Sequence, residues 1–121
     1  MTSNTSELLE LAAKAAGIGP LDFNYARREG CPGMYFGPRL PLPTGVLMAA
    51  NYTYWNPIDD DGDALRLAVK LNISIIQNEF LVRAHNKSYA GINVDFFERT
   101  KEEATRMAIV LVAAEIGRAM P

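Results

Sequence analysis

The chain has 121 residues, enough for one domain with its own hydrophobic core, and we expect a single domain over residues 1–121. Apolar residues make up 49% and charged residues 21%, a balance typical of a globular chain rather than a disordered one. The formal net charge of -2 argues against broad nucleic-acid binding, which needs a basic surface.

Cysteine content, terminal residues and hydropathy predict a cytoplasmic protein. Cys31 is the single cysteine, so an intrachain disulfide is impossible, and with the single His85 the common zinc ligand sets are also missing. The first four residues carry no positively charged side chain, which is unlike a signal peptide. The longest apolar run, from Met107 to Ala114, is too short to cross a bilayer. We therefore expect no membrane association, no metal and no cofactor.

The first predicted element is a helix that Ser6 caps and Gly17 ends, because glycine adopts the left-handed conformation easily. An irregular segment rich in proline and glycine follows over residues 18–50. An unstructured loop of that length is unusual inside a domain, so we expect short strands within it at Met34–Phe36 and Val46–Ala49.

An acidic run at residues 59–63 precedes the second predicted helix. Leu65, Ala68 and Leu71 lie at helical spacing and are the expected apolar positions, and Asn72 ends the helix. An aspartate at the start of this helix would cap it, and its negative charge would interact favourably with the positive end of the helix dipole.

Three short segments then predict an antiparallel meander: Ile73–Ile76, Phe80–Arg83 and Tyr89–Val94. The turn between the first two contains Asn78, a residue that tolerates positive φ.

The last predicted element is a long helix that runs to about Ala119. Thr100 and Glu103 form a capping box at its start, and Glu102 and Arg106 are spaced for an ion pair. Its middle is apolar on nearly every face, so we expect cover on more than one side, which leaves a homodimer open. The expected fold class is α+β: a three- to four-stranded antiparallel meander packed with three helices as a two- or three-layer sandwich.

Several short motifs resemble a family of small phage proteins. They are Trp55-Asn56-Pro57, the acidic turn at 60–64, the short helix at 65–71 and the helix segment Ala104–Ile109. This pattern is similar to the NinX-like proteins and the phage ABA sandwich domain, and the first helix is similar too. Residues 18–43 have no counterpart. The resemblance implies a phage or prophage accessory protein and carries over no catalytic residues.

The acidic run supports three interpretations. A calcium loop is excluded, because its first and last ligand positions would fall on Pro57 and Ala68. Helix initiation is the simplest interpretation, a partner surface is the second, and a metal site built by Asp59, Asp61 and Asp63 is the third.

Arginines and aromatic residues before the acidic run suggest a binding surface, because Arg, Tyr and Trp stack on ligands and are enriched at protein interfaces. The alternative is that the aromatic residues pack in the core. The candidate ligand or partner surface comprises Arg27, Arg28, Tyr35, Arg39, Tyr52, Tyr54, Trp55, Asp59 and Asp61. The sequence contains no phosphate-binding glycine motif, and Cys31 has no base nearby in sequence. The lone His85 would need an orienting carboxylate from elsewhere in the fold to act as a general base, and a surface or turn position is the simpler interpretation.

Three functions are consistent with these features. The first is a phage accessory protein without catalytic activity that binds a host or defence protein in the bacterial cytoplasm. The second is an oligomeric binder that sequesters a nucleotide-like small molecule. The third is a metal-assisted hydrolase that uses the carboxylates of residues 59–63.

Overall fold

The computed structural model describes residues 5–17, 39–41, 52–87 and 89–121. Its elements in chain order are α1 (Thr5–Ala16), β1 (Arg39–Pro41), β2 (Tyr52–Tyr54), α3 (Asp61–Lys70), β3 (Ser74–Gln77), β4 (Leu81–Asn86), β5 (Tyr89–Asp95) and α4 (Lys101–Ala119). This arrangement confirms the α+β fold class with a long C-terminal helix. The strands expected at residues 34–36 and 46–49 lie outside the described part of the chain.

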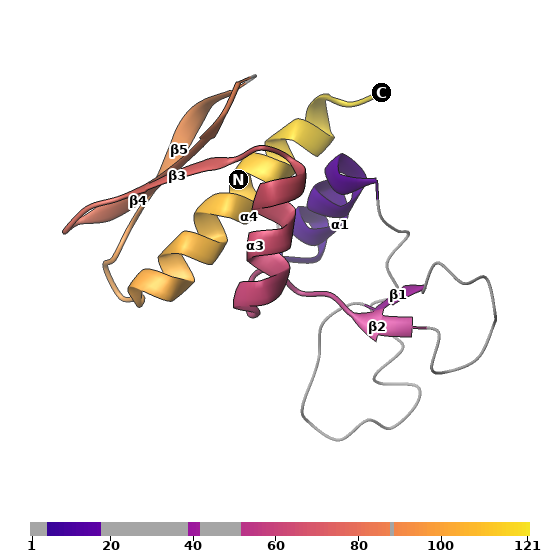
Figure 1. Cartoon of the computed structure of the whole chain (residues 1–121), viewed down its shortest axis with the longest axis horizontal. Coiled ribbons are helices and arrows are strands. Elements are labelled where there is room, and N and C mark those ends of the chain that lie inside the picture. Colours follow the sequence, from indigo (N-terminus) through magenta and orange to yellow (C-terminus); the bar gives the residue numbers. More distant parts are fainter. Residues whose placement is uncertain (1–4, 18–38, 42–51, 88) are drawn as a thin grey trace.

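Helix α4 is the centre of the fold. The three-stranded sheet lies on one side of it, α1 on another and α3 beside it (Figure 1). The buried residues of α4 are Ala104, Ala108, Ile109, Val110, Val112, Ala113, Ala114 and Gly117. The prediction that its apolar middle is covered on more than one side is therefore confirmed, and the cover comes from elements of the same chain.

Small side chains allow α1 and α4 to approach closely. Ala12, Ala13 and Ala16 of α1 are buried. At the crossing, a Cβ placed on Gly117 would lie 2.0 Å from the carbonyl oxygen of Leu11, so no other residue fits there without a shift of the helices. Leu9 and these three alanines recur at helical spacing and form the face of α1 that packs on α4.

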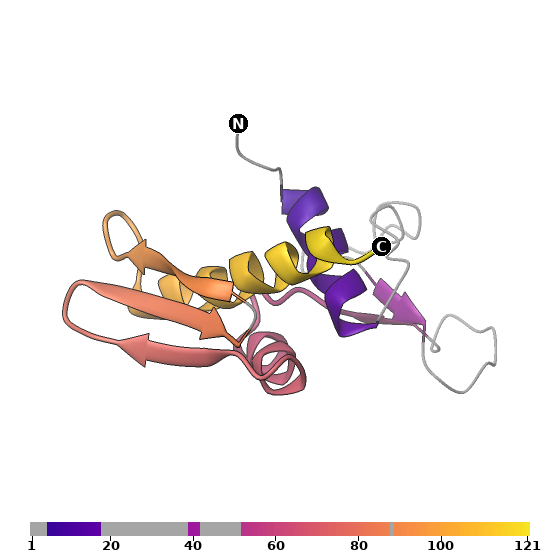
Figure 2. The same cartoon turned by 90° about the horizontal axis from the view of Figure 1, so that it is seen from above.

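The sheet has the order β3-β4-β5 and is antiparallel throughout, as predicted for a meander. Val82 and Ala84 of β4 are fully buried, because alternate residues of this central strand face α4. Seen from above, α4 runs along one face of the sheet (Figure 2). Strands β1 and β2 form a separate two-stranded antiparallel ribbon away from this sheet (Figure 1).

The helix ends agree with the sequence in most places. Gly17 has a φ of 73° and ends α1 as predicted. The start differs, because α1 already includes Thr5 and Ser6, so the expected cap at Ser6 was wrong. At the start of α4, the Glu103 amide donates to the Thr100 hydroxyl at 3.1 Å and the Thr100 amide donates to the Glu103 carboxylate at 2.9 Å. The capping box is confirmed.

The turn between β3 and β4 uses a side chain rather than a left-handed residue. Asn78 Oδ1 accepts from the amides of Phe80 at 2.7 Å and Leu81 at 3.0 Å. Among the described residues other than glycine, positive φ occurs at Asn72 and Glu98. The expectation of positive φ at Asn78 was wrong, because its side chain closes the turn without it.

Helix α3 buries Ala68 and partly buries Leu71, as expected, but leaves Leu65 in solvent. Ala64, Leu67 and Ala68 are buried, whereas Leu65 is 61% exposed and Val69 is 69% exposed. A repeat of three residues drifts around a helix of 3.6 residues per turn, so Leu65 does not stay on the face of Ala68. The result is a pair of aliphatic side chains in solvent, one turn apart.

Candidate functional site

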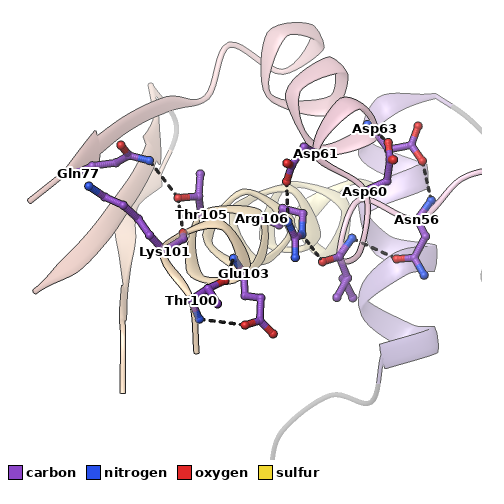
Figure 3. A network of polar contacts seen from close by, with 11 residues as sticks. Asn56, Asp60, Asp61, Asp63, Gln77, Thr100, Lys101, Glu103, Thr105 and Arg106 are labelled. Carbon is purple, nitrogen blue, oxygen red and sulfur yellow. Dashed lines mark hydrogen bonds and ion pairs between the residues drawn. The ribbon is translucent and has the colours of Figure 1, made fainter. Parts of the chain in front are cut away.

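The acidic run begins helix α3. Asp60 is the N-cap, and its Oδ2 accepts from the Asp63 amide at 2.8 Å. The Asp63 carboxylate in turn accepts from the Asn56 amide at 2.9 Å and from Arg66 at 2.7 Å. The hydrogen bond and the charge of Asp63 raise the pKa of the Arg66 guanidinium. The hydrogen bond between Asn56 and Asp63 joins the Trp55–Pro57 segment to the helix that follows it (Figure 3).

Arg106 of α4 fixes the same turn from the other side. Its Nε donates to the carbonyl oxygen of Ile58 at 2.7 Å, and its Nη1 contacts Asp61 Oδ1 at 2.5 Å (Figure 3). The Arg106 side chain is only 16% exposed. The ion pair expected with Glu102 is therefore replaced by one with Asp61, because the guanidinium turns toward α3.

Each carboxylate of the acidic run already has a partner within the protein, and Asn56 and Arg66 each contact two of the carboxylates. Asp59 accepts from the Asn56 side-chain amide at 3.3 Å, while Asp60, Asp61 and Asp63 hold the contacts given above. Across the described residues, no three His, Cys, Asp or Glu side chains are grouped so that they could hold a metal ion. This geometry supports the interpretation of the run as a helix start.

An open cleft of about 410 Å³ lies between α3, β3 and the first half of α4. Its lining residues are Asp61, Ala64, Leu65, Ile75, Gln77, Lys101, Glu102, Thr105, Arg106 and Ile109. The aliphatic members come from three different elements, and the polar and charged members come mainly from α4. The cleft therefore combines an apolar lining with polar groups, as binding sites commonly do.

The polar side of the cleft is partly fixed and partly open. Gln77 Nε2 donates to Thr105 Oγ1 at 3.0 Å, and Thr105 Oγ1 donates to the Lys101 carbonyl oxygen at 2.8 Å (Figure 3). Lys101 and Glu102 are exposed, and neither side chain forms an ion pair with any residue that the structure describes. One ammonium and one carboxylate at the cleft are thus available to a ligand or partner.

The apolar lining continues outside the cleft along α3. Leu65 lines the cleft, and Val69 follows one turn later on the same face. Both are aliphatic side chains that folding leaves in water, although burying such a side chain is favourable by about 1.5–3 kcal/mol. This stripe and the cleft form one continuous candidate contact surface, here called the α3 cleft.

The structure describes only part of the ligand or partner surface that the sequence predicted. Arg27, Arg28 and Tyr35 lie outside the described residues. The backbone of β1 pairs with that of β2 so that Arg39 lies opposite Tyr54, and Tyr52 lies opposite Pro41.

The remaining expected residues lie near α3. Trp55 is only 6% exposed and belongs to the core, so its indole supports the fold and offers little surface to a ligand. Asp59 is exposed beside the turn, and Asp61 lines the α3 cleft.

Sequence reasoning missed most of the α3 cleft, in particular Leu65, Gln77, Lys101 and Thr105. One signal was present: Leu65 and Val69 fall off the buried stripe of their helix, and two aliphatic residues on a solvent face are unusual. Gln77 and Lys101 carried no such signal, since only the tertiary fold brings the end of β3 beside the first turns of α4, where Gln77 meets Thr105.

His85 is half-buried in β4, where its backbone lies opposite Ser74, and Cys31 is outside the described residues. None of the described helices is long and apolar enough to span a membrane. Comparisons of the chain with protein-family models, with curated proteins and with solved structures found no match.

Proposed function

We propose that this protein is a non-catalytic binding protein whose α3 cleft receives an apolar segment of a protein partner. The observation that carries the proposal is the continuous stripe from the cleft lining to Leu65 and Val69, which are 61% and 69% exposed. Contiguous exposed apolar surface beside polar groups is typical of protein interaction sites.

The shape of the site favours a chain segment over a compact ligand. The cleft is open, and Leu65 in its lining and Val69 beside it are spaced one helical turn apart on α3, which suits an amphipathic segment laid along a groove. Lys101 and Glu102 would then pair with polar residues at the edge of that segment.

The resemblance to the NinX-like proteins suggests the setting of this binding. In that setting the protein is a phage or prophage accessory protein in the bacterial cytoplasm, and its partner is a host or defence protein. The motif that carries much of the resemblance, Ala104–Ile109, contains three residues that line the cleft: Thr105, Arg106 and Ile109.

Site-specific cross-linking tests the proposal. A photo-reactive phenylalanine analogue replaces Leu65 in one variant and Met120 in a control, since Met120 is 40% exposed at the far end of α4. In host cells we expect a discrete protein adduct at position 65, absent at position 120 and lost when Val69→Glu is added. Identical adducts at both positions, or an adduct that Val69→Glu leaves unchanged, would contradict the proposal.

A small-molecule binder is the second candidate, because a cleft of about 410 Å³ lies within the size range of ligand pockets. Thermal-shift measurements with nucleotides and cyclic nucleotides separate this candidate from the first. A shift that Lys101→Ala removes and Val69→Glu preserves would favour a ligand held inside the cleft. A shift that neither change affects would place that ligand elsewhere.

A further inference from the structure

Two turns meet at one end of the sheet, outside the α3 cleft. The turn at residues 78–80 joins β3 to β4, and the turn at residues 96–100 joins β5 to α4, at the same end of the sheet (Figure 2). Leu81 and Asp95 are paired in the sheet, and the Phe96 amide donates to the Phe80 carbonyl oxygen at 3.2 Å. The two turns therefore lie against each other, and we call this end the sheet tip.

The sheet tip presents two phenyl rings to solvent. Phe80 is 73% exposed and Phe97 is 77% exposed, the two largest exposed fractions among the described large apolar side chains. Their backbones are nevertheless fixed: the Phe80 amide donates to Asn78 Oδ1 at 2.7 Å and the Phe97 amide to Asp95 Oδ1 at 3.0 Å. Two ordered turns thus hold phenyl rings that contribute little to the core. Exposed aromatic side chains on a fixed backbone are typical of a surface that contacts another molecule.

Acidic side chains flank both rings. Glu79 precedes Phe80 and Glu98 follows Phe97, both are exposed, and neither forms an ion pair with another described residue. The arginine of this end, Arg99, already contacts Asp95, with 3.8 Å between Nη1 and Oδ1. Two carboxylates therefore remain uncompensated beside two aromatic faces, and both kinds of group attract cations.

We propose that the sheet tip binds a basic and apolar peptide segment of a partner protein, a segment that carries lysine or arginine beside aliphatic residues. Its cationic groups would lie over the rings of Phe80 and Phe97 and pair with Glu79 and Glu98, while its aliphatic residues cover the ring edges. This surface is separate from the α3 cleft and does not depend on the function proposed for the cleft.

The charges select this partner over two others. An anionic membrane surface would repel the uncompensated carboxylates. A second copy of this chain docked tip to tip would bring Glu79 and Glu98 toward their own symmetry mates, and like charges at an interface oppose association.

Peptide binding measured by fluorescence anisotropy tests the proposal on the full-length chain. The probe is a labelled short peptide of alternating leucine and lysine, and the matched probe has glutamate in place of lysine. We expect the lysine peptide to bind and the glutamate peptide not to bind. Phe80→Ser and Phe97→Ser should each weaken binding about tenfold, as loss of an interface anchor does.

The charge component has its own variants. Glu79→Gln with Glu98→Gln should weaken binding of the lysine peptide and reduce its dependence on salt, since screened ion pairs are lost. Met120→Ser and Asp59→Asn are matched controls, because they change an exposed apolar residue and an exposed carboxylate far from the sheet tip in sequence. Both controls should bind like the wild type.

Several outcomes would overturn the proposal. One is equal binding of the two peptides, and another is binding of the lysine peptide that the phenylalanine variants do not alter. Binding to phosphatidylserine vesicles that is lost in Phe97→Ser would assign the rings to a membrane instead. A doubled mass in light scattering that Phe97→Ser abolishes would assign them to a second copy. Unchanged circular dichroism verifies that each variant is folded.

Discussion

Arg106 donates through Nε to the carbonyl oxygen of Ile58 at 2.7 Å, across 48 positions of sequence, and so fixes the turn before α3 to the central helix. The same side chain meets Asp61 and lines the α3 cleft. The Arg106 guanidinium therefore both holds the fold together and shapes the candidate site.

Replacement of Arg106 by alanine should lower the free energy of unfolding by about 1–3 kcal/mol, because it leaves the half-buried Ile58 carbonyl without its donor. Asp61→Asn should cost less than about 1 kcal/mol, since the Asp61 side chain is 74% exposed and solvent screens its ion pair. Urea denaturation of both variants measures the difference. A larger cost for Asp61→Asn would mean that the ion pair, and not the hydrogen bond to Ile58, carries the contact.

Gly117→Ala should destabilise the protein by about 1–3 kcal/mol or more, because the new methyl group would overlap the Leu11 carbonyl oxygen and force α1 away from α4. Gly17→Ala is the matched control, since nothing lies within 4 Å of its added Cβ and only the positive φ of 73° opposes it. We expect about 1–2 kcal/mol for that strain. Thermal melting measures both losses, and hydrogen exchange distinguishes them: it should increase along the whole of α1 in Gly117→Ala but only in its last turn in Gly17→Ala. Equal protection of α1 in both variants would contradict the close crossing.

Within the acidic run, Asp63 should matter more than Asp59. The Asp63 side chain is 13% exposed and accepts from Asn56 and Arg66, so Asp63→Ala should cost about 1–3 kcal/mol. Asp59→Ala should change the stability by less than about 0.5 kcal/mol, as surface changes usually do. Chemical denaturation of the two alanine variants tests this order. A reversed order, or melting temperatures that depend on added Mg²⁺ or Ca²⁺ in wild type only, would revive the metal interpretation.

The capping box of α4 predicts a pH-dependent contribution to stability. Two hydrogen bonds lower the pKa of the Glu103 carboxyl: the larger effect comes from the Thr100 backbone amide and the smaller from the Thr100 side chain. A lowered folded-state pKa means that the stabilisation is complete above the unfolded-state pKa, about 4.3 for glutamate. The stabilisation is lost as the pH falls through the lower value of the folded state.

Glu103→Gln isolates this effect, since glutamine keeps a hydrogen-bond acceptor without the charge. The stability difference between wild type and this variant should be constant near neutral pH and shrink in acid. Thr100→Ala should cost about 1 kcal/mol near neutral pH, because it removes the N-cap oxygen, and part of this cost should remain in acid, where the Glu103 carboxyl is protonated. A wild-type advantage that grows in acid would contradict the shift at Glu103.

The amino-acid sequence by itself determined the local features whose causes lie within a few residues. The capping box at Thr100, the aspartate cap of α3 and the glycine end of α1 follow from backbone groups that need nearby partners. The antiparallel meander follows equally from short strands separated by tight turns. The all-round apolar middle of α4 required cover on several sides, and α1, α3 and the sheet provide it.

Only the tertiary structure decided which groups meet across the fold. The sequence spacing predicted that Arg106 would pair with Glu102 of its own helix. In the structure, the packing of α3 on α4 instead places Asp61 and the Ile58 carbonyl within reach of the Arg106 guanidinium. From the sequence, the Trp55 indole could lie either on a binding surface or in the core. In the structure it lies in the core, because other apolar residues pack around it. The α3 cleft and the sheet tip arise from segments distant in sequence, and local propensity carries no information about such contacts.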